Sequence, residues 1–407
     1  MQRLVVVGAS LAGLRAVEAA RRAGFTGQVT LVGAEEHLPY DRPPLSKKLL
    51  GRDGPTAVAP FRTERELRDD LGVELLLGAP ADGLDASERE VTVAGRGVPY
   101  DALVVATGAS PRGLSGAEGI AGVHSLRTAE DSAAIRAALD EGARTVVVGA
   151  GFIGSEVASA ARARGLPVTV VETLVVPLSR AVGAEVGTVC AQLHELAGTD
   201  LRTGTGVTGI ESDDGRVTGV RLDDGSVVPA DLVVLGTGVA PATQWLQDSG
   251  VRLHEHDRGI VCDATLATEA PGVYAAGDVA HVPNPLFDDD LMRLEHWTNA
   301  AEQGAAAARH ALDPHSAKPL SAVPYFWSDW YSSRIQFVGT PTADEVAVVD
   351  ADPERFLALY RRDDRAVGAV SINRARDVMK VRRHIVERSP WSEALAFAQG
   401  RQRSGVS

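Results

Sequence analysis

Cysteine is scarce in this sequence. Its 407 residues include two cysteines, Cys190 and Cys262, which stand far apart and form no Cys-x-x-Cys arrangement. Disulfide-stapled proteins and cysteine-based zinc sites need several cysteines at short spacings, so we expect neither here. A reducing compartment is the natural environment for such a chain.

Long apolar runs and excess basic charge are also lacking. No apolar run approaches the ~20 residues that a membrane-spanning helix needs. The opening stretch MQRLVVVGAS enters a strand at once and leaves no room for a signal peptide, so we expect a cytoplasmic protein. The net charge of −13 argues against nucleic-acid binding, which requires a basic surface.

Aromatic residues form only 5% of the chain, yet six of them fall within residues 324–337, PYFWSDWYSSRIQF. Packing alone could explain this concentration. The overall composition, 44% hydrophobic and 23% charged, is that of a folded globular protein. A chain of this length can form two or three domains.

The N-terminal segment resembles a nucleotide-binding unit. Residues 3–24 read as a β-branched strand, a turn with the spacing Gly8-x-Ser10-x-x-Gly13, and an alanine-rich helix. Glu35 ends the next predicted strand, where a carboxylate can accept ribose hydroxyls while a pyrophosphate binds the helix N-terminus. Ser10 replaces the second glycine of the fingerprint, so an ordinary strand–helix turn is the alternative.

A second unit follows in residues 144–172. It contains Gly149-x-Gly151-x-x-Gly154 between a predicted strand and a predicted helix, and Glu172 closes the next strand. A carboxylate at this position favours NAD, because it would repel the 2′-phosphate of NADP. Two such units imply two dinucleotides, and the simplest pairing is a bound flavin with a diffusing nicotinamide.

The order of three further strands indicates a split domain. Residues 100–111 and 230–241 read as apolar strands that end in Thr-Gly, and residues 268–282 as a strand that ends in Gly-Asp. The second fingerprint lies between the two Thr-Gly strands. We therefore expect the second nucleotide-binding domain to be inserted into the first.

The last hundred residues follow a different pattern. Residues 345–350 and 355–373, the latter with a polar turn at Asp363-Asp364, predict antiparallel strands, and 377–387 predict a helix. The fold class that we predict is α/β, with two Rossmann-like dinucleotide-binding domains, for FAD and NAD, and a C-terminal α+β interface domain. The predicted boundaries are 1–112 and 233–317 for the FAD-binding domain, 113–232 for the NAD-binding domain and 318–407 for the interface domain.

Nearly the whole chain resembles the FAD-dependent NADH:ferredoxin reductases of bacterial oxygenase systems, of the putidaredoxin reductase and biphenyl dioxygenase reductase type. This is a branch of the glutathione-reductase-like flavoproteins. The resemblance rests on HLPYDRPPLSK (37–47), ATG (106–108), LRTAED (126–131), GAGFIGSEVA (149–158), YAAGDVA (274–280), RLEHWTNAAEQG (293–304), FWSDWYSSRIQFVG (326–339) and SINRARDVM (371–379).

This resemblance implies two sets of cofactor-binding residues. Those expected to bind FAD are Gly8, Ser10, Ala12, Gly13, Glu35, Arg42, Lys47, Ala81, Thr107, Gly108, Arg127, Gly277, Asp278 and Trp297. Those expected to bind NADH are Gly149, Gly151, Phe152, Ile153, Gly154, Glu172 and Gly238.

The resemblance also implies roles in the reaction. Lys47 and Glu156 are expected to pair beside the reactive nitrogen of the flavin, where a fixed ammonium stabilises developing negative charge. The alternative is a surface lysine and a glutamate that favours a helix start. Phe152 either covers the flavin until nicotinamide displaces it or packs in the core. Trp327 is expected near the flavin ring on the ferredoxin side, and Trp330 stands where the family commonly has glutamine.

The reaction type depends on what residues 39–51 do not contain. Disulfide reductases of this fold carry a redox cysteine pair there and NADH oxidases carry one cysteine, whereas this chain has PYDRPPLSKKLLG. Electrons must therefore leave the flavin directly, and a flavin suits a hydride donor and a one-electron [2Fe–2S] acceptor. No zinc-type spacing occurs among the ten histidines, and we predict no metal site, including at HEHD (254–257).

We predict an NADH:ferredoxin oxidoreductase that supplies a cytochrome P450 or Rieske oxygenase, as a monomer or homodimer. The basic residues expected to steer an acidic ferredoxin are Arg293, Arg374, Arg376, Lys380, Arg382 and Arg383. A solvated helix face is the alternative for this cluster. Rival functions are a rubredoxin reductase or NADH oxidase on the same fold, and a redox-sensing interaction protein resembling apoptosis-inducing factor.

Overall fold

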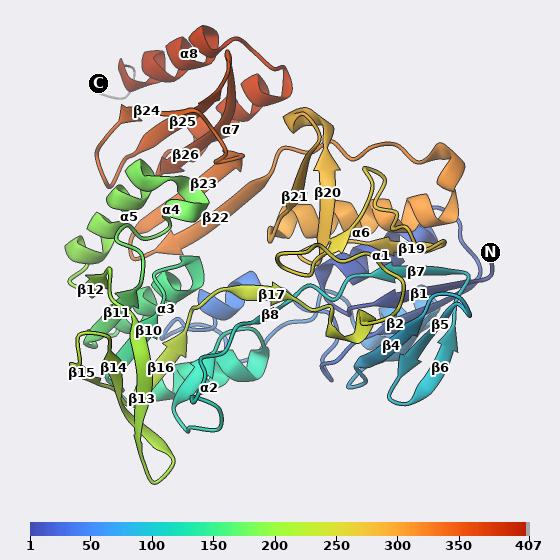
Figure 1. Cartoon of the computed structure of the whole chain (residues 1–407), viewed down its shortest axis with the longest axis horizontal. Helices are drawn as coiled ribbons and strands as arrows, with labels where there is room; N and C mark the ends of the chain where they lie inside the picture. Colours follow the sequence, from blue (N-terminus) through green and yellow to red (C-terminus); the bar gives the residue numbers. More distant parts are fainter. Residues whose placement is uncertain (404–407) are drawn as a thin grey trace. The chain divides into compact units, whose positions relative to one another are not determined.

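The computed structural model describes residues 1–403, with side chains described to residue 400 (Figure 1). The chain divides into two compact units, each built from segments distant in the sequence. The first unit comprises Met1–Asp41, Ala59–Ser110 and Val239–Pro324. The second comprises Arg42–Val58, Pro111–Gly238 and the chain from Tyr325 onward.

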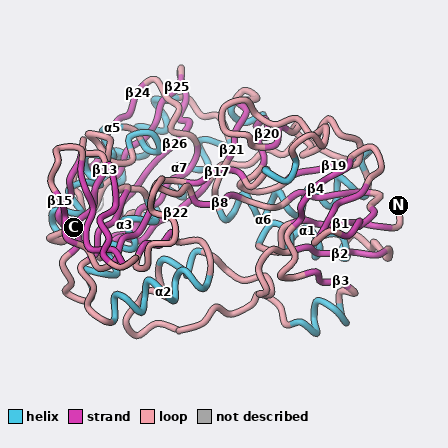
Figure 2. The backbone as a smooth tube through the Cα atoms, turned by 60° about the horizontal axis from the view of Figure 1, so that its bottom comes forward, coloured by secondary structure: helices cyan, strands magenta, loops and turns pink. Residues whose placement is uncertain are grey.

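The first unit is built on a parallel five-stranded sheet in the order β19-β7-β1-β2-β3. Figure 2 shows β1, β2 and β3 side by side. The strands are β1 (Arg3–Val7), β2 (Gln28–Val32), β3 (Val73–Leu76), β7 (Ala102–Val105) and β19 (Val273–Ala275). Valine and leucine dominate them because parallel strands covered on both faces must be apolar throughout. Helices α1 (Leu11–Arg22) and α6 (Trp297–Leu312) pack on this sheet.

Two smaller three-stranded sheets complete the first unit, one antiparallel and one in which β18 runs parallel to β20. One three-stranded sheet contains β4 (Ala81–Asp85), β5 (Glu90–Val93) and β6 (Arg96–Pro99). A second contains β18 (Ile260–Val261), β20 (Ala280–Asn284) and β21 (Asp290–Arg293), in which β20 pairs with both neighbours. The chain passes between the units through the paired strands β8 (Ala109–Pro111) and β17 (Val239–Pro241).

A second parallel five-stranded sheet forms the first half of the second unit, in the order β12-β11-β10-β16-β9. Its strands are β9 (Val123–Ser125), β10 (Thr145–Val148), β11 (Val168–Glu172), β12 (Asp200–Thr203) and β16 (Leu232–Leu235). The helices of this region are α2 (Ala129–Asp140), α3 (Phe152–Ala163), α4 (Ser179–Val182) and α5 (Ala184–Leu196). A small antiparallel sheet of β13 (Val207–Asp213), β14 (Arg216–Leu222) and β15 (Val227–Pro229) packs against strands β10, β11 and β16.

The C-terminal part of the second unit is an antiparallel sheet in the order β22-β23-β26-β25-β24. Its strands are β22 (Tyr325–Trp330), β23 (Ser333–Gly339), β24 (Glu345–Asp350), β25 (Leu357–Arg362) and β26 (Arg365–Ile372), followed by α7 (Ala375–Val386) and α8 (Trp391–Arg403). The aromatic segment 324–337 thus forms the hairpin β22–β23. Its turn places Tyr331 at a positive φ of 52°.

The predicted fold class is confirmed: two parallel Rossmann-like sheets and an antiparallel C-terminal domain. The strand predicted at 345–350 coincides with β24, and the helix predicted at 377–387 begins two residues early. Residues 42–58 differ from expectation, because they belong to the second compact unit and not to the first. Within the described residues, the helices are too short or too polar to cross a membrane.

The crossing of α1 and α6 depends on small residues. A Cβ placed on Gly304 of α6 would lie 2.1 Å from the carbonyl oxygen of Ala12 in α1. The two backbones can approach this closely only because Gly304 has no side chain. This contact fixes the helix that leaves the first glycine turn.

We predict that Gly304→Ala lowers the free energy of unfolding by about 1–3 kcal/mol, because the added methyl group forces the two helices apart. The measurement is urea-induced unfolding followed by circular dichroism. Gly209→Ala is the matched control, since a Cβ there meets no atom within 4 Å. An unfolding midpoint for Gly304→Ala equal to that of the wild type would contradict the prediction.

Candidate functional site

The glycine turn of the first unit has no space for side chains. Gly8 adopts a φ of +119°, and a Cβ there would lie 2.1 Å from the carbonyl oxygen of Ala106. A Cβ on Gly13 would lie 1.9 Å from the carbonyl oxygen of Gly8. Ser10 is the N-cap residue of α1, and its side chain forms no capping hydrogen bond. The small residues therefore bring the start of α1 against the end of β1, the geometry that lets backbone amides approach a pyrophosphate.

Polar side chains gather beyond the carboxyl ends of the same strands. The hydroxyl of Tyr40 donates a 2.6 Å hydrogen bond to Glu35, which follows β2. The indole nitrogen of Trp297, the first residue of α6, donates a 2.8 Å hydrogen bond to Asp41. In open α/β sheets this edge is where ligands bind.

The residues expected to bind FAD are divided between the two compact units. The first unit holds Gly8, Ser10, Ala12, Gly13, Glu35, Ala81, Thr107, Gly108, Gly277, Asp278 and Trp297. The second holds Arg42, Lys47 and Arg127. Side chains on Gly8 and Gly13 would collide with backbone at the pyrophosphate position, so the chain fits a dinucleotide there. Their roles as FAD ligands remain a prediction.

The fingerprint of the second unit repeats this construction. Gly149 adopts a φ of +103°, and its Cβ would lie 2.4 Å from the carbonyl oxygen of Gly236. A Cβ on Gly154 would lie 2.3 Å from the carbonyl oxygen of Gly149. Gly151 is the N-cap of α3 and lies clear of such contacts, its nearest neighbour being 3.9 Å away. Gly151 is thus the position where a bound phosphate can approach the backbone.

Glu172 supports this second turn directly. One of its carboxylate oxygens accepts a 2.9 Å hydrogen bond from the amide of Ala150, inside the fingerprint. The other accepts from the amide of Leu174, also at 2.9 Å. The hydroxyl of Thr173 adds a 3.2 Å hydrogen bond to the same oxygen as Leu174, and since a carboxylate has about four acceptor positions, capacity remains for a ribose hydroxyl. Gly238 lies exposed after β16, and Ile153 is exposed in the first turn of α3.

A buried ion pair joins Lys47 to Glu156. The ammonium group of Lys47 lies 2.8 Å from one carboxylate oxygen of Glu156 and 2.9 Å from the other. The Glu156 side chain is 3% exposed and that of Lys47 is 20% exposed. The structure therefore brings together the two residues that sequence reasoning paired, although they lie more than a hundred positions apart.

Three further donors hold the Glu156 carboxylate. The hydroxyl of Ser46 donates to one oxygen, and the hydroxyl of Ser328 donates to the other. The amide of Asp329 adds a 3.2 Å hydrogen bond. Buried charges are tolerated when they are paired and hydrogen-bonded in this way. Sequence reasoning missed Ser46 and Ser328, because a lone serine carries no pattern; their positions beside Lys47 and Trp327 were the only signal.

Trp330 is completely buried behind this cluster. Its indole nitrogen donates a 2.9 Å hydrogen bond to the hydroxyl oxygen of Ser328, which in turn donates to Glu156. Trp330 thus supplies a hydrogen-bond donor to Ser328 at the position where the family resemblance led us to expect glutamine.

The remaining aromatic residues of the hairpin divide into two groups. Phe326 contacts Phe152 of α3, with ring centroids 4.8 Å apart, and Phe152 also lies 6.1 Å from Trp330. Trp327 stacks on Tyr325 at 5.9 Å, and the guanidinium of Arg334 lies 5.9 Å from its ring. Phe152 is therefore partly packed against the hairpin, while Trp327 remains half-buried on the other side of the strand.

A second buried network surrounds His194. Its ring nitrogens lie 2.7 Å from the hydroxyl of Tyr331 and 3.2 Å from the hydroxyl of Ser155. Tyr331 also contacts the hydroxyl of Thr199 at 2.8 Å. Burial lowers the pKa of His194 to about 4, so the ring is neutral at pH 7. This network ties α5 to the turn of the aromatic hairpin.

The predicted ferredoxin-steering residues do not form one surface. Arg374 is buried, with its guanidinium 2.9 Å from both Asp350 and Asp377, so it cannot contact a partner protein. Arg293 is also largely buried and forms a 2.7 Å ion pair with Asp257. These two assignments are corrected: both arginines act inside the fold.

The other basic residues lie on helix α7. Arg376, Lys380 and Arg383 are exposed at positions i, i+4 and i+7, which places them on one face. Arg382 is half-buried beside them. These four residues are the part of the predicted cluster that solvent can reach.

Both cysteines are buried, and burial raises the pKa of each thiol to about 12. A thiol protonated at neutral pH is a poor nucleophile. Neither cysteine therefore has the character of a redox-active thiol.

Two dinucleotide turns, a buried lysine–glutamate pair and the lack of a redox thiol define an oxidoreductase with two dinucleotide-binding domains. Family comparison agrees, because the pyridine nucleotide-disulphide oxidoreductase family matches residues 2–304 and the reductase C-terminal family matches residues 325–400. The chain belongs to the pyridine nucleotide-disulphide oxidoreductase family, and the resemblance found in the sequence is confirmed.

Individual relatives are similar over nearly their full length. The ferredoxin–NAD(+) reductase component of the p-cumate 2,3-dioxygenase system of Pseudomonas putida is 35% identical, covering 96% of this chain and 94% of that protein. Putidaredoxin reductase CamA of Pseudomonas putida is 34% identical, covering 95% and 92%. The structure of the covalent putidaredoxin reductase–putidaredoxin complex matches with a TM-score of 0.90 and 33% identity, covering 98% of this chain and 99% of that one.

We predict that stability falls as pH decreases from about 6.5 toward 4. The pKa of His194 is lower in the folded state than in the unfolded state. Between these two pKa values the unfolded chain binds a proton at His194 and the native chain does not, so a fall in pH favours unfolding. The slope from one such group approaches ~1.4 kcal/mol per pH unit. His194→Gln should show a shallower fall than the wild type in urea unfolding between pH 7 and pH 5.

His315→Gln is the control for this measurement, because His315 is exposed and its replacement should leave the slope unchanged. The same slope for wild type and His194→Gln would show that burial of the ring does not govern the pH dependence.

Proposed function

We propose that this protein takes hydride from NADH onto bound FAD and passes the electrons singly to a [2Fe–2S] ferredoxin. The ferredoxin supplies a cytochrome P450 or a Rieske oxygenase. One relative named above is the ferredoxin–NAD(+) reductase component of a dioxygenase system, and a putidaredoxin reductase has been captured in a covalent complex with putidaredoxin. The scarcity of cysteine and the burial of both thiols support a cytoplasmic location.

The observation that carries this proposal is the Lys47–Glu156 pair in a chain without a redox thiol. Bound FAD would accept two electrons as a hydride and release them one at a time. Lys47 supplies a positive charge that is fixed before the reaction, which costs no reorganisation when negative charge develops nearby. Glu156 and its serine donors hold that ammonium in one position.

The two glycine turns support the cofactor assignment. The start of α1 and Glu35 suit the pyrophosphate and ribose of FAD, and Glu172 favours NADH over NADPH by charge repulsion. Anaerobic titration of the purified yellow protein with NADH and with NADPH tests this choice. We expect NADH to bleach the visible absorbance of the flavin fully at a much lower concentration than NADPH does. Bleaching at equal concentrations of the two nucleotides would exclude the assigned role of Glu172.

Ferredoxin, rubredoxin and oxygen should be compared as acceptors in the same NADH-driven assay. We expect turnover with a [2Fe–2S] ferredoxin to exceed turnover with the other two. Faster reduction of rubredoxin or oxygen would favour a rubredoxin reductase or an NADH oxidase. Negligible turnover with all three, despite flavin bleaching, would favour a redox-sensing protein.

We predict that Lys47→Gln slows reduction of the bound FAD by NADH on the order of ten- to a hundredfold, because a preorganised charge is lost. Stopped-flow absorbance under anaerobic conditions measures this step alone. Lys48→Gln is the matched control, since Lys48 is the next residue and is exposed. Equal rates for the two variants would contradict a role for Lys47 in the reaction.

We predict that Trp327→Ala slows ferredoxin reduction more than reduction of FAD by NADH. The half-buried indole is proposed to shield the flavin on the side where the ferredoxin binds. Both half-reactions are measured separately by stopped flow, and Trp391→Ala at the start of α8 is the control. Equal slowing of the two half-reactions would show that Trp327 acts only through packing.

We predict that the exposed basic face of α7 accelerates ferredoxin binding at low salt. Replacing Arg376, Lys380 and Arg383 together by glutamine should lower kcat/KM for ferredoxin, and the loss should shrink as ionic strength rises. Arg216→Gln on the β13–β14 hairpin is the control, because Arg216 is exposed and distant in sequence. An unchanged kcat/KM at low salt would show that α7 does not steer the partner.

A further inference from the structure

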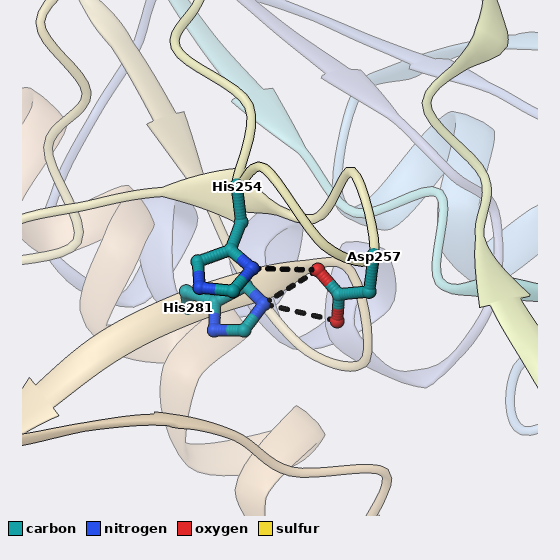
Figure 3. A group of neighbouring side chains, drawn as sticks. All are labelled: His254, Asp257 and His281. Carbon is teal, nitrogen blue, oxygen red and sulfur yellow. Dashed lines mark hydrogen bonds and ion pairs between the residues drawn. The ribbon is translucent and has the colours of Figure 1, made fainter.

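Two histidines and an aspartate of the first unit converge beside β20. His281 lies on β20, and His254 and Asp257 lie on the loop that precedes β18 (Figure 3). The loop is held against its own return strand by a hydrogen bond from the amide of His254 to the carbonyl oxygen of Gly259. Figure 3 shows both imidazole rings directed at the Asp257 carboxylate.

The spacing of the polar atoms suits a metal ion. Nε2 of His281 lies 2.9 Å from Oδ1 of Asp257, and Nδ1 of His254 lies 3.3 Å from the same oxygen. All three ligand atoms lie within 4.8 Å of one another. A tetrahedral zinc ion with bonds of about 2.0–2.1 Å places its ligand atoms roughly 3.3 Å apart, which is close to the two nitrogen–oxygen distances found here.

The cluster is incomplete without a further partner. Nδ1 of His254 is buried and makes no hydrogen bond within the described part of the chain, and its 3.3 Å approach to Oδ1 of Asp257 lacks hydrogen-bond geometry. A buried nitrogen without a hydrogen bond is costly, and a metal ion would satisfy its lone pair. The carboxylate, by contrast, is already oriented as a ligand requires.

Asp257 is fixed from behind by donors outside the cluster. Nε of Arg293 donates to its Oδ2 at 2.7 Å, and the amide of Gly259 donates to Oδ1 at 3.0 Å. Hydrogen bonds of this kind orient the carboxylate ligands of metal sites. Arg293 also pairs with Glu295 at 2.7 Å. Its positive charge is therefore shared between two carboxylates and does not fully neutralise the negative charge of Asp257.

The two rings also indicate which residue must move. They stack with centroids 4.2 Å apart and an interplanar angle of 18°. A metal ion prefers to lie in the plane of each imidazole that binds it, so one ring must turn. The His254 side chain is 27% exposed and that of His281 is 9% exposed, so His254 is the ring free to turn, and its exposure leaves a fourth position for water.

We propose that His254, Asp257 and His281 bind one divalent transition-metal ion of the zinc class. Two imidazoles and a monodentate carboxylate are ligands that zinc accepts, with water in the remaining position. The ion would link the 254–259 loop to β20, because its ligands come from both. It binds in the first unit independently of either dinucleotide and replaces the prediction that HEHD carries no metal.

The test is isothermal titration of the untagged, chelator-treated flavoprotein with zinc chloride, followed by metal analysis after dialysis. We expect one zinc ion per chain. His281→Ala and Asp257→Asn should each weaken binding at least tenfold, while His256→Ala, which removes the exposed histidine between the two loop ligands, should leave it unchanged. Absence of saturable binding, or equal binding by the wild type and His281→Ala, would overturn the proposal.

His254→Ala is the variant least expected to disturb folding. The His254 side chain is more exposed than that of His281, so its removal opens no core cavity. It should retain the wild-type near-ultraviolet circular dichroism yet lose zinc affinity at least tenfold. Cobalt(II), used as a probe in place of zinc, should give the intense visible bands of tetrahedral coordination in wild type only. Wild-type zinc affinity in His254→Ala would equally overturn the proposal.

Discussion

Burying the Glu156 carboxylate constrains the whole second unit. A buried charge is costly unless it is paired and hydrogen-bonded, and here the donors come from two stretches of chain that are distant in sequence from Glu156. Ser46 and Lys47 reach it from the segment before the inserted domain, and Ser328 and Asp329 reach it from β22. The C-terminal sheet and residues 42–58 therefore both donate hydrogen bonds to one carboxylate of the inserted domain, that of Glu156.

This constraint connects the fold to the chemistry. The same hydrogen bonds that stabilise Glu156 fix the Lys47 ammonium, so structural stability and charge placement share one network. Trp330 also belongs to this network. Its indole N–H donates to the hydroxyl oxygen of Ser328, and the hydroxyl hydrogen of Ser328 is donated to Glu156. The aromatic hairpin is thus both a packing element and a second layer around the ion pair.

Much of this organisation is readable from the sequence because it depends on local chemistry. Gly8 and Gly149 stand where positive φ angles are required, and Glu172 closes the strand whose end meets the fingerprint. The family resemblance implied the distant Lys47–Glu156 pair, but the other side-chain partners distant in sequence were not predictable. A run of arginines and lysines does not reveal that Arg374 turns inward to Asp350, and HEHD gives no sign of His281 beside it. Burial and partner choice arise only once the chain has folded.

The central claim is that Glu156 acts on the reaction through Lys47. A double-mutant cycle tests it, using the anaerobic rate of FAD reduction by NADH for Lys47→Gln, Glu156→Gln and the double variant. If the two residues work as one unit, the double variant will be no slower than the slower single variant. Rate losses that multiply in the double variant would show that Lys47 and Glu156 act independently, and would contradict the account.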